Sequence, residues 1–172
     1  MNELNDLLAW ATAAIEDRYF LLPQAEQKPA YRERVYCYEL YHQLRRIWPK
    51  PCAYTLNGEV DKAGHGLLRK VNADRLKPDF LVHIPGDMNG NFAVMEVKPR
   101  TASEAGIAKD LATLRRFTMK VGYQRGIYLI YGHSATARAE RALAMLEAHE
   151  SAKLVQVWVH LEPGASAYPL NL

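Results

Sequence analysis

The 172-residue sequence contains only two cysteines, Cys37 and Cys52. They form neither a disulfide framework nor the paired spacing of a zinc site, and this scarcity favours a reducing compartment. No apolar run approaches the length needed to span a membrane, and the acidic start at residues 1–6 lacks the basic region of a signal peptide. We therefore expect a cytoplasmic protein with no membrane partner.

Several motifs that mark common chemistries are also missing. The sequence has no glycine-rich phosphate loop, no Gly-x-Ser-x-Gly elbow and no cysteine/histidine zinc pattern. A net charge of +3 and a pI of about 8.8 are compatible with a nucleic-acid partner without establishing one. With 49% hydrophobic residues, the chain has enough apolar surface for one globular domain over residues 1–172.

Residues 77–99 form the most informative stretch. Two short apolar segments, which read as strands, are joined there by a turn rich in glycine and asparagine. Asp79 opens the first strand, and Glu96 and Lys98 lie near the end of the second. In a hairpin the start of one strand lies beside the end of the other, so these three charged groups should converge at one end of the sheet.

These charges lie where a strand should be buried. Side chains alternate along a strand, so Glu96 and Lys98 share a face and Val97 points the other way. Both faces are otherwise apolar, which indicates a strand covered on both sides. Burying a carboxylate is costly without compensation, and Lys98 supplies it for Glu96 but leaves Asp79 without a partner. A divalent cation shared by the two carboxylates is the simplest solution.

The rest of the chain alternates between helical and strand patterns. We expect a first helix that ends before Pro23, a polar linker over 24–28, and helices over about 29–48, 101–121 and 134–149. The segment 101–104 matches a capping box. Strands are expected over 53–60, 126–131 and 154–161, followed by a loosely ordered tail. The 126–131 strand should pair in parallel with the Glu96 strand through a right-handed crossover.

The sequence Pro78-Asp79, followed after one hairpin by Glu96-Val97-Lys98, resembles the active-site signature of the PD-(D/E)xK nuclease superfamily. This is the fold of restriction endonucleases and archaeal Holliday-junction resolvases. The resemblance implies an α/β protein with a restriction-endonuclease-like mixed β-sheet flanked by helices. Its core order αβββαβ would cover residues from about 31 to 131, with an extra N-terminal helix and a C-terminal helix and strand.

The resemblance also implies roles for the charged residues. Asp79 and Glu96 would be direct ligands of Mg²⁺ or Mn²⁺, which prefer hard oxygen donors, and the backbone carbonyl of Val97 would be a third ligand. Lys98 would hold and help deprotonate the attacking water, or stabilise the charge that develops on the phosphorus centre.

A glutamate on the helix before the strands completes the metal site in many members of this superfamily, and Glu39 is its counterpart by resemblance. Glu39 lies at the border of the apolar stripe expected for that helix, whose members are Tyr31, Val35, Tyr38, Tyr41, Leu44 and Trp48. It would bind a second ion or orient a water molecule. The alternative interpretation is a solvated glutamate that pairs with Gln43 or Arg46.

Two basic segments are candidates for nucleic-acid contacts. Lys62 and His65 belong to a glycine-containing basic stretch over 61–77, and Lys109, Arg116 and Lys120 recur at helical spacing after the Glu96 strand. Both sets could follow a phosphate backbone, and both could be ordinary solvated charges. The parts played by His65 and Glu59 stay open at this point.

Together these features predict a metal-dependent endonuclease that hydrolyses phosphodiester bonds. DNA is the expected substrate, and RNA is the other possibility. The chain has no room for a separate specificity domain, so specificity would come from loops, a homodimer or a partner protein. A phage-defence or restriction-type effector fits by analogy. The alternative is a catalytically silent module of the same fold that binds nucleic acid or a protein partner.

Overall fold

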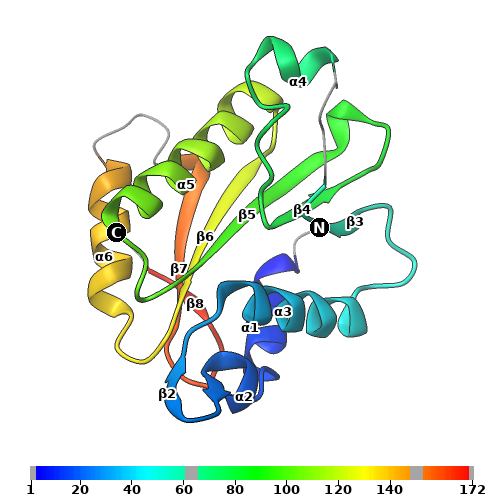
Figure 1. The fold of residues 1–172 in the computed structure, drawn as a ribbon. Helices are drawn as coiled ribbons and strands as arrows, with labels where there is room; N and C mark the ends of the chain where they lie inside the picture. Colours follow the sequence, from blue (N-terminus) through cyan, green and yellow to red (C-terminus); the bar gives the residue numbers. More distant parts are fainter. Residues whose placement is uncertain (1–2, 61–65, 148–152, 171–172) are drawn as a thin grey trace.

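The computed structural model describes residues 3–60, 66–147 and 153–170 (Figure 1). The helices are α1 (Leu4–Ala13), α2 (Asp17–Phe20), α3 (Glu33–Ile47), α4 (Gly66–Lys70), α5 (Glu104–Arg116) and α6 (Thr136–Glu147). The strands are β1 (Leu22–Gln24), β2 (Gln27–Ala30), β3 (Thr55–Gly58), β4 (Phe80–His83), β5 (Asn91–Pro99), β6 (Arg125–Tyr131), β7 (Val155–His160) and β8 (Tyr168–Pro169). None of these helices is both long enough and apolar enough to cross a membrane.

The described strands β3 to β8 form one mixed sheet whose order follows the sequence. The strands β3, β4 and β5 are antiparallel neighbours, β5, β6 and β7 run parallel, and β8 is antiparallel to β7. The predicted parallel pairing of the 126–131 strand with the Glu96 strand is therefore confirmed. The strand β5 lies inside the sheet, which agrees with its apolar residues on both faces.

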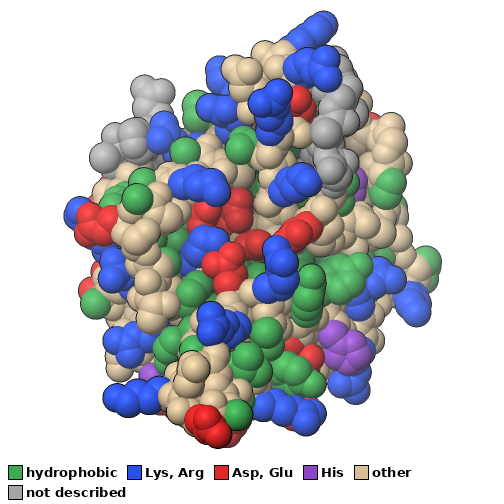
Figure 2. Space-filling view, in the orientation of Figure 1, with side chains coloured by type: hydrophobic (Ala, Val, Ile, Leu, Met, Phe, Trp, Pro, Cys, Tyr) green, Lys and Arg blue, Asp and Glu red, His purple; other side chains and the backbone are tan. Residues whose placement is uncertain are grey.

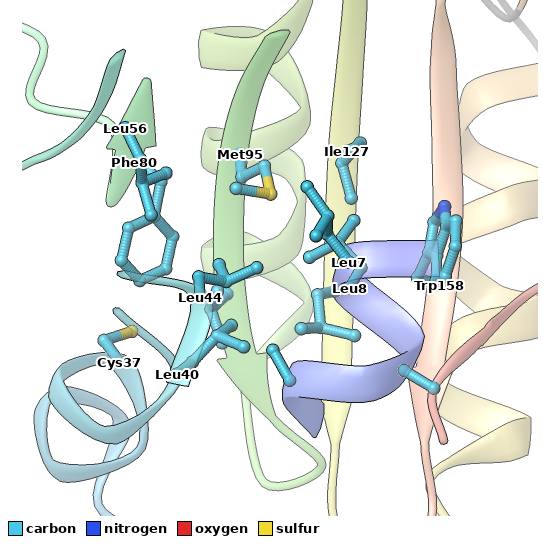
Figure 3. Packing of buried hydrophobic residues seen from close by; sticks show 14 of the residues in the cluster. Leu7, Leu8, Cys37, Leu40, Leu44, Leu56, Phe80, Met95, Ile127 and Trp158 are labelled. Atoms are coloured by element: carbon cyan, nitrogen blue, oxygen red, sulfur yellow. The ribbon is translucent and has the colours of Figure 1, made fainter. Parts of the chain in front are cut away.

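Helices cover both faces of this sheet, so the protein is a mixed α/β structure. The helices α1 and α3 pack on one face, where Figure 3 shows Leu8, Leu40 and Leu44 against Met95 and other strand residues. The helices α5 and α6 pack on the other face (Figure 1). Alternation along β5 supplies both cores, because Met95 belongs to the first and Val94 to the second.

Three segments differ from the expected secondary structure. Instead of one helix that ends before Pro23 and a polar linker over 24–28, the chain forms α1, α2 and the β1–β2 hairpin. The predicted basic loop contains α4. The tail is not loose, because β8 pairs with β7 and the Leu170 N–H donates to the Val157 carbonyl at 2.9 Å. Such short polar strands carry no hydrophobic alternation, and only their pairing partners specify them.

The helix α3 is rotated relative to the predicted stripe. Its buried residues are Tyr36, Cys37, Leu40, Gln43 and Leu44. The side chain of Tyr38, expected in the core, is 66% exposed. Tyrosines occur on more than one side of this helix, so their apolar character does not define its phase. The rotation determines which glutamate of α3 faces the end of β5.

The helix α5 begins two residues later than the predicted capping box implies. Its N-cap is Ser103, whose Oγ accepts a hydrogen bond from the Gly106 N–H at 3.1 Å. A π-helical turn over Phe117–Val121 extends the helix, and Gly122 ends it in the left-handed conformation with φ of 89°. The buried side of α5 packs on the face of β5 that carries Val94 and Glu96.

Candidate functional site

Asp79 and Glu96 meet across the β4–β5 pair. The register pairs Phe80 with Met95, and one step further places Asp79 opposite Glu96 with both side chains on the same face. The two carboxyl groups interact, and Asp79 opposes the ionisation of Glu96 and raises its pKa. The Val97 N–H donates to Asp79 Oδ2 at 2.7 Å, so the main chain after Glu96 also contacts this pair.

Lys98 completes the group from the same face of β5. Its Nζ lies 2.7 Å from Glu33 Oε1 in the first turn of α3 and 3.5 Å from Asp110 Oδ2 on α5. The ammonium group is thus held between the two helices that flank the end of the strand. The three residues of the predicted signature, Asp79, Glu96 and Lys98, do lie together in the structure.

Burial and mutual repulsion dominate the electrostatics of the carboxyl pair. Burial raises the pKa of Asp79 from 3.8 to about 6, although the Val97 N–H partly opposes the shift. Burial also raises the pKa of Glu96 well above its ordinary range, and the charges of Asp79 and Asp110 add to the effect. Glu96 is only 6% exposed. This pair therefore holds negative charge poorly unless a cation joins it.

The surrounding charges do not supply that cation. Among the described residues, Lys98 interacts with four carboxyl groups, those of Glu33, Asp79, Glu96 and Asp110. Four ionised carboxylates against one ammonium would leave an excess of three negative charges in a partly buried space. Such an excess is costly in a medium of low dielectric constant. The site is therefore short of positive charge.

Lys98 itself stays protonated at neutral pH. Burial alone would lower the pKa of its ammonium group, but the hydrogen bond that Lys98 donates to Glu33 and the charges of Asp110, Glu33 and Asp79 outweigh burial and raise the pKa above its usual value. A group in this state donates hydrogen bonds and stabilises negative charge. The position of Nζ between Glu33 and Asp110 is compatible with both predicted roles of Lys98.

Asp110 and Glu33 were not recognised in the sequence. Asp110 is 4% exposed and occupies an inward position of α5, spaced three and four residues from Ile107 and Leu114. An aspartate within an apolar helical stripe is unusual, and this pattern could have identified it. Glu33 had no comparable local pattern, because its role depends on where the first turn of α3 packs.

Glu39 lies elsewhere on α3. Its Oε1 accepts a hydrogen bond from Gln43 Nε2 at 2.6 Å, which is the alternative interpretation weighed for this residue. Six residues separate Glu39 from Glu33, and at 3.6 residues per turn they point in directions about 120° apart. Glu33, rather than Glu39, contacts Lys98.

A cavity of about 390 Å³ opens beside Asp79. Its lining residues come from α3 and the β3–β4 pair: Glu33, Arg34, Cys37, Tyr38, Tyr41, Gly58, Glu59, Asp79 and Phe80. Figure 2 shows acidic side chains at the middle of this face, between α5 and α3, with hydrophobic side chains adjoining them near α3. Glu59 thus lies at the cavity, where its Oε1 is 3.9 Å from Arg34 Nη2.

The predicted nucleic-acid contacts have different outcomes. Lys62 and His65 lie outside the described residues. Lys109, Arg116 and Lys120 are exposed on α5 and its π-helical extension. Arg116 Nη1 donates to the Asn72 carbonyl at 2.8 Å and thereby ties α5 to the segment after α4.

The donor set suits a hard divalent cation that shares its coordination with water and phosphate. Within the described ranges, no group of three or more histidine, cysteine or acidic side chains is arranged as a metal cage. Mg²⁺, however, commonly uses one or two carboxylates together with waters and substrate oxygens. Asp79 and Glu96, with the adjacent main chain of Val97, fit this mode, and the shortage of positive charge favours it.

Comparison with known proteins assigns neither a family nor a function to this chain. A scan against protein-family models, a search of curated proteins and a search of solved structures each found no match. The function of this chain therefore has to be argued from its own residues and their geometry.

Proposed function

We propose that this protein is a metal-dependent nuclease that hydrolyses phosphodiester bonds, with DNA as its substrate. The observation that carries the proposal is the buried pair of Asp79 and Glu96 on adjacent strands, with Lys98 two residues further along on the same face. A scaffold protein has no use for three such charges in a position where they oppose folding.

The order of the elements supports a restriction-endonuclease-like core. The helix α3 precedes the antiparallel strands β3, β4 and β5, and α5 then leads to β6, which is parallel to β5. This is the αβββαβ order that the sequence resemblance implies, with α4 inserted between β3 and β4. The helix α1 and the segment from α6 to β8 are the additions at the two ends.

The residues of the site have separate tasks in this proposal. Asp79 and Glu96 hold Mg²⁺ or Mn²⁺, with the Val97 carbonyl as a further candidate ligand. The bound ion supplies a Lewis acid that lowers the charge on the phosphoryl group and acidifies water. Lys98, protonated and directed by Glu33 and Asp110, donates to a phosphate oxygen or to the attacking water and stabilises the charge of the transition state.

The acidic site also explains why the reaction should require a cation. A phosphodiester carries a negative charge and would be repelled by the uncompensated carboxylates. The exposed side chains of Lys109 and Lys120 provide positive charge on α5 and its extension, and the charge of Lys109 also acts on its neighbour Asp110. Both lysines can attract the polymer to this face. Specificity would come from loops, a homodimer or a partner protein, as in a restriction-type or phage-defence effector.

The test is cleavage of supercoiled plasmid in Mg²⁺ or Mn²⁺, with and without chelator. We expect nicking that stops with chelator and is lost in Asp79→Ala and Lys98→Ala. The matched controls are Asp87→Ala, in the exposed β4–β5 turn, and Lys28→Ala, on β2, both of which should cut like the parent.

The same samples distinguish the alternatives. DNA binding by the parent and both site variants, without cutting by the parent, would support a catalytically silent module. Labelled RNA in the same assay decides whether RNA is the substrate. Cutting that persists in Asp79→Ala at the parent's rate would rule out the proposed site.

A further inference from the structure

The cavity beside Asp79 has the walls of an aromatic binding site. Phe80 and Cys37 are buried at its inner side, and Tyr41 lies parallel to Phe80, with an angle of 4° between the ring planes. The Tyr41 hydroxyl donates to the Leu56 carbonyl at 3.4 Å, which fixes that ring. Tyr38, at 66% exposure, stands at the edge of the cavity. One wall is thus rigid and apolar, and one aromatic ring remains accessible.

Polar groups also line the cavity. Arg34 and Glu59 approach each other at 3.9 Å, and both side chains are more than half exposed. They offer a hydrogen-bond donor group and an acceptor group beside the aromatic wall. A planar molecule with apolar faces and polar edges fits this combination, and nucleobases have this character.

The cavity adjoins the carboxyl pair through Asp79, which lines the cavity and interacts with Glu96. A strand whose phosphate lies at Asp79 and Glu96 would therefore present its attached sugar and base at the mouth of the cavity. The volume of about 390 Å³ is within the range of small-molecule sites and admits one base. In a continuous duplex the bases are stacked and paired, and extruding one costs a few kcal/mol.

Building on the proposed nuclease function, we propose that this cavity binds one unstacked nucleobase of the nucleotide next to the cleaved phosphate. The preferred substrates are then nucleic acids with an unpaired nucleotide, such as single strands, bulges and flaps. Tyr38 and Tyr41 supply the aromatic surfaces, and Arg34 and Glu59 contact the polar edge of the base. Because stacking is tolerant of sequence, the pocket selects for unpaired structure more than for a particular base.

Binding is tested with an oligonucleotide of roughly 15 nucleotides that carries 2-aminopurine, whose fluorescence is quenched on stacking, with Ca²⁺ in place of Mg²⁺. We expect quenching by the parent and by Tyr38→Phe, which keeps the ring. Tyr38→Ala should bind the single strand ~5- to 100-fold more weakly and lose the quenching. The control Trp10→Ala removes an exposed aromatic ring from α1 and should match the parent. Equal affinity and quenching in Tyr38→Ala and the parent would overturn the pocket.

A cleavage experiment separates this proposal from the nuclease proposal. The parent and Tyr38→Ala are incubated in Mg²⁺ with a continuous duplex and with the same duplex carrying one bulged nucleotide. Preferential cutting of the bulged duplex, reduced in Tyr38→Ala, supports the pocket. Equal cutting of both duplexes by both proteins, still abolished by Asp79→Ala, overturns the pocket and leaves the nuclease proposal standing. If the parent cuts neither duplex, the nuclease proposal fails, and the fluorescence experiment alone decides whether a base is bound.

Discussion

Two buried polar clusters lie at the carboxyl ends of the parallel strands, on opposite faces of the sheet. On one face, the Tyr36 hydroxyl and His160 Nδ1 are 2.7 Å apart, beside Tyr131. On the other face lie the carboxyl pair and Lys98. Lys98 directly precedes Pro99, the β5 residue that pairs with Tyr131. The helix α3 contributes to both clusters, with Glu33 to the second and Tyr36 to the first.

The two clusters treat charge differently. Burial lowers the pKa of His160 to about 4, so its ring is neutral at pH 7 and bonds to a neutral phenol. Rings complete the cluster, with Tyr36 stacked on Tyr131 at 3.8 Å and Phe20 edge-on to His160 at 4.9 Å. The acidic cluster instead gathers four carboxyl groups around one ammonium group. Burial of polar groups alone therefore gives no reason to expect chemistry, whereas an excess of buried carboxyl groups favours a bound cation.

The largest expected effect separates activity from stability. Asp79→Asn should reduce plasmid cleavage by about 10³-fold or more, because a ligand worth several kcal/mol of transition-state stabilisation is lost. Its stability without metal should not fall. Tyr36→Phe should do the opposite. Its unfolding free energy should fall by about 1–3 kcal/mol while its cleavage rate stays near that of the parent, because only the hydrogen-bond partner of His160 is removed. Initial cleavage rates and urea unfolding check both. A Tyr36→Phe protein that is stable and inactive would contradict the comparison.

The pH dependence of stability should have opposite signs at the two clusters. The folded-state pKa of Asp79 is raised to about 6, so the folded state binds more protons than the unfolded chain between about pH 4 and 6, and stability falls as pH rises through this window. The pKa of His160 is lowered to about 4, so stability falls as pH drops from about 6.5 to 4. Each effect amounts to roughly 3 kcal/mol at most.

Metal-free urea unfolding between pH 4 and 7 measures these slopes, with Asp79→Asn and His160→Gln as the matched variants. The unfolding free energy of the parent minus that of Asp79→Asn should decrease as pH rises, and the corresponding difference from His160→Gln should increase. Slopes of the same sign in the two comparisons would show that the clusters are not electrostatically distinct.

Mg²⁺ should stabilise the folded protein only by binding at the acidic cluster. At a concentration 100 times its Kd, Mg²⁺ adds about 2.7 kcal/mol to the unfolding free energy. We expect the melting temperature of the parent and of Tyr36→Phe to rise with Mg²⁺ by similar amounts, and that of Asp79→Asn to stay constant. A thermal melt with increasing Mg²⁺ at pH 7 is sufficient. An unchanged rise in Asp79→Asn would place the ion elsewhere.

The smallest effect concerns the two glutamates of α3. Glu33→Gln weakens the hold on Lys98 and should reduce cleavage about 10-fold, in line with the loss of one charge-assisted hydrogen bond. Glu39→Gln should stay within about twofold of the parent, because its partner is Gln43. Cleavage rates at saturating Mg²⁺ compare the two variants, and a larger loss in Glu39→Gln would favour the role that the resemblance implied for it.

Features set by residues close in the sequence could be predicted, whereas features set by distant contacts could not. Continuous apolar runs located β5 and β6, and the helix between them implied their parallel pairing. The opposition of Asp79 and Glu96 needed only a hairpin. The phase of α3 was misjudged, since tyrosines lie on its exposed and buried sides alike. The β1–β2 hairpin and β8 were missed, because their few polar residues carry no pattern that distinguishes a strand from a loop.

The sequence alone determined that two acids and a lysine would share one face at the end of the central strands, because strand alternation and hairpin geometry are local rules. Only the tertiary structure decided which groups surround them. Lys98 and Glu33 are 65 positions apart, and their contact depends on how α3 docks against the end of β5. Packing also decided that Tyr38 borders the cavity. Side-chain packing over long range chooses such neighbours, and no periodicity in the chain encodes them.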